Sequence, residues 1–275
     1  MTLHLSWQQK FRALIALTLI SLALMAAASL WASHRLSSAL QAREQAASYA
    51  SASTELMNRW WRQNAQRQQL TPEQLAAFGS GLDELHELVG QLLTKAQALR
   101  DDDTLQHAQR IQAILEEELE QQRQWLSFNQ ALGLSPFDGQ RKVLSEKGKA
   151  LEAISFDLIK PFITSALSSQ RDYLSTFDPA FAQIALTAIG KLQEQIADLE
   201  WQQTPIGKNV QAYADAFGEA HASIERINAT NQHLGQLGED LQARMAQQAR
   251  ALQDGLLLRR AQEAEQSRIS ALWLM

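Results

Sequence analysis

Two arginines, Arg59 and Arg62, are spaced so that they could hold an anion together. Residues three positions apart lie on the same face of a helix, so the two side chains would point in one direction. Each planar guanidinium group can hold a carboxylate through two parallel hydrogen bonds. Trp60 and Trp61 lie between them and could line such a site, where the exclusion of water strengthens ion pairing. The segment is therefore a candidate site for a small carboxylic acid.

The alternative is that both arginines lie on a solvated helix surface. The two arginines lie beside a buried seam, and not on it, if the apolar face of this helix consists of Leu36, Leu40, Ala47, Ala50, Thr54, Met57 and Trp61. The sequence leaves both interpretations open.

Other kinds of site are not indicated. The absence of cysteine excludes disulfides, thiolate metal ligands and cysteine nucleophiles. The histidines have no paired metal-binding spacing, and neither a nucleotide-binding glycine loop nor a serine nucleophile elbow occurs. A run of glutamates is typical of a solvated helix face, and it consists of Glu116, Glu117, Glu118 and Glu120. We therefore expect no enzyme activity, no cofactor and no metal.

The composition is typical of long helices. Hydrophobic residues make up 45% of the 275 positions and charged residues 20%, which excludes an intrinsically disordered chain. The 12 glycines and 5 prolines are too few for the frequent turns of a β-sandwich or barrel. The formal net charge of −5 argues against nucleic acid as a partner.

Residues 13–32 carry no charge and form a predicted transmembrane helix. At a rise of about 1.5 Å per residue, this segment is long enough to cross the hydrocarbon core of a bilayer. Lys10 and Arg12 precede it, so we expect residues 1–12 in the cytoplasm and the following chain outside. The alternative is a cleaved signal peptide that ends near residues 26–28.

At the other end, residues 271–275 are apolar and follow Arg268, which resembles the opening of a second transmembrane helix. Residues 33–270 would then form the extramembrane domain, and an output module would follow the second helix.

Prolines mark the expected helix starts. Four of the five follow a residue that caps helices, and the proline then occupies the first turn, as in Thr71-Pro72, Ser135-Pro136, Asp178-Pro179 and Thr204-Pro205. The sequence thus predicts six extramembrane helices, at residues 33–70, 72–100, 103–132, 136–176, 178–203 and 205–270. Pro161 should kink or split the fourth.

The last predicted helix is much longer than the first two, which a single four-helix bundle does not accommodate. Its apolar residues keep a coiled-coil spacing from Val210 to Leu252, interrupted by Asn231 and Gln248, polar residues that would fix the helix register. We therefore predict an all-α, elongated domain of two stacked four-helix bundles that share the last helix. The direction of residues 133–176 stays open.

This layout of anchor, helical domain and second anchor resembles the bacterial methyl-accepting chemotaxis receptors. More narrowly, residues 11–275 look like the part of these receptors that contains a helical bimodular (HBM) sensor domain, with six helices in two stacked four-helix modules. The usual single four-helix sensor is shorter. The family's cytoplasmic adaptor (HAMP) and methylated hairpin are absent from this sequence, and the same sensor occurs on some histidine kinases.

The resemblance implies a sensor of small organic acids. In the family, four-carbon dicarboxylates bind the membrane-proximal module, where an arginine pair on the first periplasmic helix clamps them, and acetate-like acids bind the distal module. Arg59 and Arg62 match that pair, and Arg244 on the last helix is a candidate third cation. Candidates for the distal module, with surface or interface positions as the alternative, are Arg171, Tyr173 and Tyr213.

We therefore expect an extracytoplasmic sensor in the bacterial inner membrane that binds a dicarboxylate or acetate, acts as a homodimer and reaches cytoplasmic signalling partners through a C-terminal part. The alternatives are the sensor region of a histidine kinase and a membrane-anchored structural coiled coil that tethers partners without a ligand.

Overall fold

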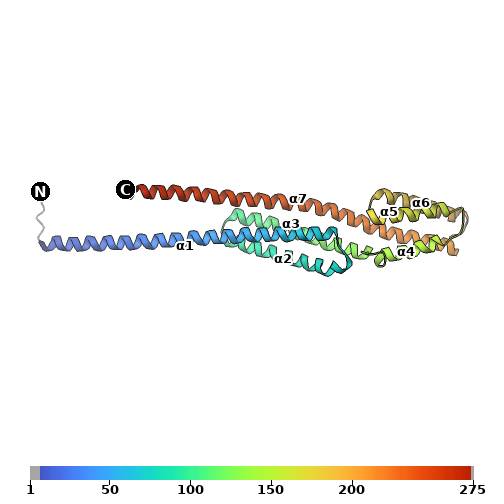
Figure 1. The fold of residues 1–275 in the computed structure, drawn as a ribbon, viewed down its shortest axis with the longest axis horizontal. Helices are drawn as coiled ribbons and strands as arrows, with labels where there is room; N and C mark the ends of the chain where they lie inside the picture. Colours follow the sequence, from blue (N-terminus) through green and yellow to red (C-terminus); the bar gives the residue numbers. More distant parts are fainter. Residues whose placement is uncertain (1–6, 274–275) are drawn as a thin grey trace.

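The computed structural model describes residues 7–273, without the side chains of residues 7–10, 12, 13, 252 and 255–273. The helices in this part are α1 (Trp7–Gln68), α2 (Leu75–Ala98), α3 (Asp102–Leu132), α4 (Gly139–Glu152), α5 (Lys160–Thr176), α6 (Pro179–Asp198) and α7 (Pro205–Trp273), and a single 3-10 turn, η1 (Pro72–Gln74), precedes α2 (Figure 1). The side chains of Lys10, Arg12 and the predicted second span at 271–275 lie outside the described residues.

The helices form a rod in which two groups follow one another (Figure 1). The proximal group lies nearer both ends of the chain and consists of α1, α2, α3 and the C-terminal part of α7, with α2 packed on α1 and α3, and α3 packed on α7. The distal group consists of α4, α5, α6 and the N-terminal part of α7, with α5 packed on α6, and α4 and α6 packed on α7. α7 therefore belongs to both groups.

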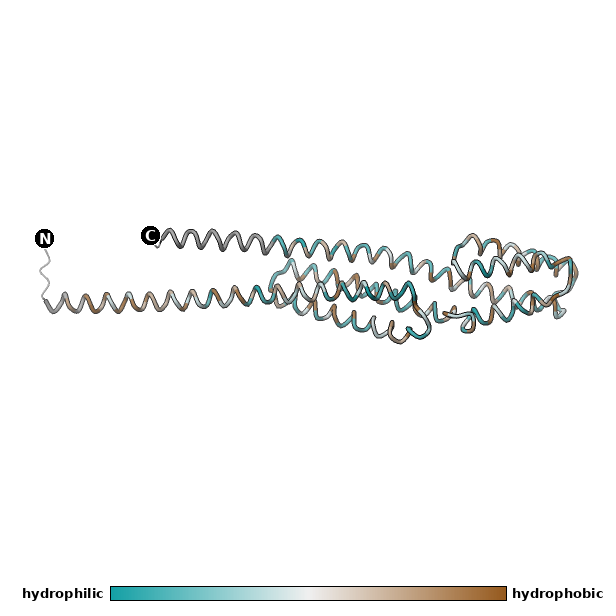
Figure 2. Tube along the Cα trace, viewed as in Figure 1, coloured by the Kyte–Doolittle hydropathy of each residue, from teal (hydrophilic) through white to brown (hydrophobic). Residues whose placement is uncertain are grey.

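α1 extends far beyond the proximal group (Figure 2). Its N-terminal part holds an apolar stretch that is long enough to cross a membrane and that is not buried in the protein. A membrane span and a signal sequence share this character. α1 continues without a break through residue 33, where the sequence places the start of the extramembrane domain.

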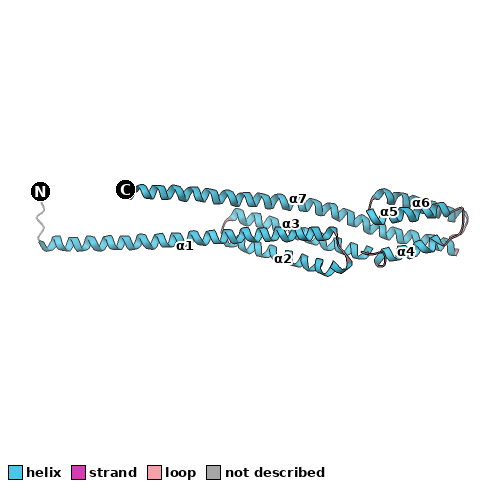
Figure 3. Cartoon of the chain, viewed as in Figure 1, coloured by secondary structure: helices cyan, strands magenta, loops and turns pink. Residues whose placement is uncertain are grey.

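The predicted fourth helix, residues 136–176, is split into α4 and α5 near Pro161, as the sequence predicts, so the count of six predicted helices after residue 33 is one too low. Figure 3 shows the break as one of the short connections in an otherwise helical chain, and between residues 7 and 273 no strand occurs. Pro161 lies in the first turn of α5, where its missing N–H has no helical partner to lose. The ring of Phe177, which follows α5, lies 5.7 Å from the Arg141 guanidinium near the start of α4. α5 therefore runs back along α4, which settles the direction that the sequence leaves open.

Side chains cap two of the predicted helix starts. The Asp101 carboxylate accepts a hydrogen bond from the Thr104 backbone N–H at 3.1 Å, and the Asp178 carboxylate accepts one from the Ala180 N–H at 2.9 Å. These bonds satisfy amides that lack partners within the first turn of a helix.

Two glycines close the connection between α3 and α4. Gly133 has a φ of 96° and Gly139 a φ of 55°, values that favour glycine. A Cβ atom on Gly133 would lie 2.3 Å from the backbone oxygen of Asp138, so no larger residue fits without a shift of the backbone. The two helix groups are thus joined by a tight, defined turn.

The buried face of α1 differs from the predicted seam. The residues that face the core are Tyr49, Ala52, Leu56, Trp60 and Gln63. Trp60 is 3% exposed and Trp61 51% exposed, so the predicted seam through Trp61 is wrong by one residue, or about 100° of helix rotation. Both series of residues have a helical spacing, but only Trp60 finds a hydrogen-bond acceptor for its indole in the core.

α7 follows its predicted seam as far as Gln248, and the side chain of Leu252, the last seam position, lies outside the described residues. Its buried residues include Val210, Tyr213, Phe217, Ala220, Ile224, Ile227, Leu234, Leu241, Met245 and Gln248. Asn231 is the exception, because it is exposed while its neighbour Thr230 is buried. The side-chain oxygen of Asn231 accepts a hydrogen bond from Arg67 of α1 at 2.9 Å, so this polar residue links α7 to α1 at the edge of the seam.

Candidate functional site

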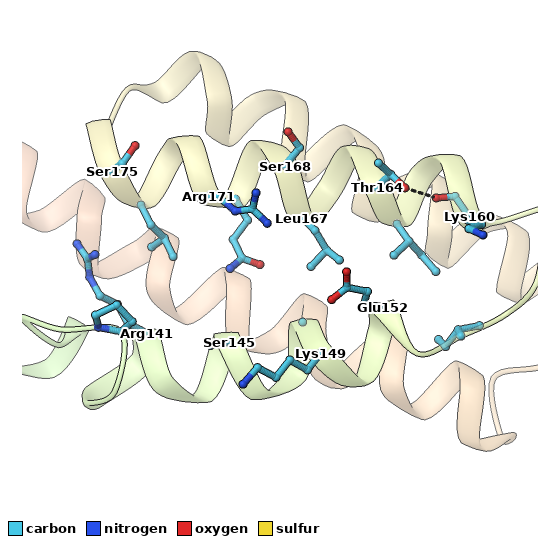
Figure 4. Close-up of a pocket in the computed structure, with 16 residues that line it drawn as sticks. Arg141, Ser145, Lys149, Glu152, Lys160, Thr164, Leu167, Ser168, Arg171 and Ser175 are labelled. Atoms are coloured by element: carbon cyan, nitrogen blue, oxygen red, sulfur yellow. Dashed lines mark hydrogen bonds between the residues drawn. The ribbon is translucent and has the colours of Figure 1, made fainter.

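A groove of about 800 Å³ runs between α4 and α5 in the distal group. It is open to solvent on the outer face, and its walls come from these two antiparallel helices (Figure 4). Gly148 lies on its α4 wall, where a Cβ atom would come within 3.1 Å of Leu167 on α5. The groove has the size of an ordinary small-molecule site.

The groove is strongly cationic although the chain as a whole is anionic. Arg141 and Lys149 of α4 and Lys160 and Arg171 of α5 line it, against a single carboxylate, that of Glu152. Among the described residues, none of these five side chains forms an ion pair. Uncompensated cations that face one groove make an anion the favoured ligand.

Arg141 is the most buried of these cations. Its Nε atom is buried and has no hydrogen-bond partner among the described residues. Burial lowers the pKa of Arg141 from its ordinary value, and the nearby charge of Asp138 acts in the opposite direction. An anion bound beside Arg141 would supply the acceptor that this guanidinium lacks.

A hydrogen bond to α7 holds an uncharged polar group of the groove, the amide of Gln170. The Tyr213 hydroxyl donates to Oε1 of Gln170 at 2.8 Å, and Gln170 lines the groove from α5. Because the amide oxygen is engaged by Tyr213, the donors on Nε2 are what this side chain can offer to a ligand.

The distal candidates from the sequence divide into two kinds. Arg171 lines the groove, whereas Tyr173 and Tyr213 are buried and do not. The Tyr173 hydroxyl lies 2.8 Å from Nδ1 of His221 on α7, and burial raises the pKa of Tyr173 to about 12. The two tyrosines therefore connect α5 to α7 behind the groove. Arg141, Lys149 and Lys160 are missed by sequence reasoning, because their convergence depends on the antiparallel pairing of α4 with α5.

Arg59 and Arg62 line a second groove, of about 540 Å³, between α1 and α2. Three glutamates line it too, namely Glu55, Glu84 and Glu87. Arg59 forms an ion pair with Glu84, whereas Arg62 is exposed and has no ion-pair partner among the described residues. The predicted pair thus does share a groove, but one of its cations is already neutralised.

The remaining candidates of this region do not line the α1–α2 groove. Trp60 is in the core and Trp61 on the outer surface, so neither forms the wall expected for them. Arg244 pairs with Asp240 on its own helix at 3.4 Å and is not a third cation of this groove.

A third polar cluster lies inside the proximal group, around Glu118 of α3. Glu118 is fully buried, so the prediction that it belongs to a solvated run is wrong. Its Oε1 accepts hydrogen bonds from the Trp60 indole at 2.7 Å, from Gln122 at 2.9 Å and from Asn64 at 3.3 Å. Burial raises the pKa of Glu118, although these bonds and the charge of Arg67 act to lower it. The cluster ties α1 to α3.

The sequence does contain a signal for the burial of Glu118. Glu118 continues the spacing of Ile111 and Leu115, and Gln122 and Trp125 follow it at the same spacing, all of them buried. The three neighbouring glutamates, Glu116, Glu117 and Glu120, fall off this face and are exposed.

Comparison with known proteins adds no relative: the chain matches no protein-family model and no curated protein sequence. Among the described residues no cluster of histidine and carboxylate side chains could hold a metal ion.

The α1–α2 groove gives a direct test of the arginine pair. A dicarboxylate there would have to displace Glu84 from Arg59, so Glu84→Gln should strengthen the binding of succinate. Arg59→Ala and Arg62→Ala should each weaken it tenfold or more, because a hydrogen bond to a charged group contributes about 1.5–3 kcal/mol. Calorimetric titration with succinate measures this binding. All variants carry Arg171→Gln, which weakens anion binding in the α4–α5 groove, so the signal comes mainly from the α1–α2 groove.

Arg110→Ala, on the exposed face of α3, is the control and should change nothing. Unchanged succinate binding in both arginine variants would mean that the pair is solvated surface.

Proposed function

We propose that this chain is the ligand-sensing part of a bacterial transmembrane receptor of the chemotaxis type, with a bimodular helical sensor outside the inner membrane that binds a small organic anion. The two helix groups would be its two stacked four-helix modules. The observation that carries the proposal is the α4–α5 groove, in which four cations face one carboxylate without internal partners.

The arrangement of α1 and α7 supports a receptor. The apolar stretch of α1 would anchor the chain in the membrane, and α7 leads from the distal group back toward the same end of the rod (Figure 1). A second copy would pack on the outer face of α1, where Leu36, Leu40 and Trp61 are exposed. The homodimer remains a prediction from this exposed face.

A bound anion can transmit a signal only through unequal affinity for two arrangements of the helices. The α4–α5 groove contacts α7 through the bond from Tyr213 to Gln170. A ligand that pulls α4 and α5 together would therefore bias the position of α7, which continues through the proximal group. A histidine kinase with the same sensor would use the same step, and the proposal holds for either output.

The structural alternative, a tether without ligand, predicts no response to anions. We expect at least one acid from a panel of acetate, propionate, succinate, malate and tricarballylate to raise the melting temperature of the full chain in detergent micelles, because a ligand that binds only the folded state stabilises it, by about 2.7 kcal/mol at a hundred times Kd. Arg171→Gln should reduce the shift, since its guanidinium faces the groove.

Arg110→Gln serves as the control for the loss of one positive charge and should keep the full shift. Absence of any shift across the panel would favour the tether.

A further inference from the structure

We infer that the α4–α5 groove is built for an anion with three or more negative charges, and not for a monocarboxylate such as acetate. This inference rests on the proposed function and names the class of ligand that the groove selects.

The charges of the groove lining do not balance. Glu152, at the end of α4, supplies the one carboxylate of the lining, and in Figure 4 it lies between Lys160 and the other cations, one helical turn from Lys149. Four cations stand against this carboxylate, namely Arg141, Lys149, Lys160 and Arg171. The lining as a whole therefore has three positive charges in excess.

A monocarboxylate would neutralise only one of the three excess positive charges. Arg141 is the most buried of the cations: its Nε atom is buried without a hydrogen-bond partner among the described residues, while the side chain as a whole is half-buried and the charge of Asp138 acts on it. Lys149 and Arg171 stand on opposite walls, so an anion that satisfies all three must carry charges that are separated in space and directed to both helices.

The uncharged polar groups of the lining are also suited to oxyanions. The hydroxyls of Ser145 and Ser168 can donate, whereas that of Ser175 already donates to the Asp172 carbonyl. The Gln170 amide oxygen accepts from Tyr213, which leaves its Nε2 donors for a ligand. The planar guanidinium group of arginine can donate two parallel hydrogen bonds to either a carboxylate or a phosphate group. A tricarboxylate and a pyrophosphate therefore share the required chemistry.

The test is a charge series on the full chain in detergent micelles at fixed ionic strength, titrated with propionate, succinate, tricarballylate and pyrophosphate. We expect affinity to rise at least tenfold from propionate to the best trivalent or tetravalent anion. Whether tricarballylate or pyrophosphate binds more tightly identifies the source of the charge, and either result supports the inference.

Lys149→Gln provides the matched variant, with Lys147→Gln as its control. Lys147 is an exposed lysine of α4 that does not line the groove. Lys149→Gln should weaken the binding of tricarballylate tenfold and the binding of propionate by less, so that affinity rises less steeply with the charge of the anion. Lys147→Gln should leave the affinities unchanged.

Propionate that binds as tightly as the trivalent anions would overturn the inference and leave the proposed sensor of organic anions standing. No binding by any of the four anions would overturn the proposed function, and this inference with it.

Discussion

Trp60→Ala is expected to lower the free energy of unfolding by about 3–5 kcal/mol, the range for truncation of a buried tryptophan. The Trp60 ring fills the space between α1 and α7 beside Gly238, where an added Cβ atom would lie 3.3 Å from it. The substitution would also remove the shortest hydrogen bond to the buried Glu118 carboxylate. Urea unfolding followed by circular dichroism measures the loss.

Trp61→Ala is the matched control, because it removes the same side chain one position further along α1. Trp61 is half exposed, so Trp61→Ala should lower the free energy of unfolding by less than about 1 kcal/mol. Equal losses in the two variants would contradict the orientation of α1. If Trp60→Ala prevents folding, Trp60→Phe tests the hydrogen bond alone and should retain most of the packing.

Glu118→Ala is expected to have a similarly large effect, about 3 kcal/mol or more. It leaves a cavity in the core and removes the common acceptor of Trp60, Asn64 and Gln122. Glu120→Ala, in the same run but exposed, should change stability by less than about 0.5 kcal/mol. A loss of similar size in both variants would contradict the burial of Glu118.

Glu118→Gln separates the charge of this group from its packing. Because burial raises the pKa of Glu118 in the folded state, the folded protein holds this proton more tightly than the unfolded chain does. Its contribution to stability is therefore complete below the unfolded pKa of about 4.3 and is lost as the pH rises through the folded pKa. The stability of the wild type relative to Glu118→Gln should thus fall as the pH rises from 4 to 8, and a constant difference would contradict this coupling.

The helical architecture is largely readable from the sequence because its determinants are local. Caps and prolines act within one turn of the helix, so Asp101 and Asp178 mark helix starts that the structure contains. Pro161 marks the break between α4 and α5 for the same reason. The reversal of the chain at this break depends on the packing of α4 on α7 and of α5 on α6, and contacts between such distant segments have no local signature.

The candidate site is much less predictable. On α1, two seams one residue apart have the same spacing, and the choice between Trp60 and Trp61 depends on a partner from α3 that is 58 positions away. Glu118 shows the converse, since its position in an apolar series indicates burial while its charge indicates exposure. The α4–α5 groove combines side chains whose proximity exists only once the two helices are paired.

The weak contact between α1 and α7 has a mechanical consequence. These two helices lead to the ends of the chain, yet in the proximal group α7 packs extensively on α3 and touches α1 only sparsely. The hydrogen bond from Arg67 to Asn231 and the close approach of Trp60 to Gly238 are contacts that cross this interface. A shift of α7 along α1 would therefore meet little direct resistance between these two helices, and it would be opposed chiefly through α3, which packs on α7 and is tied to α1 by the buried Glu118 cluster.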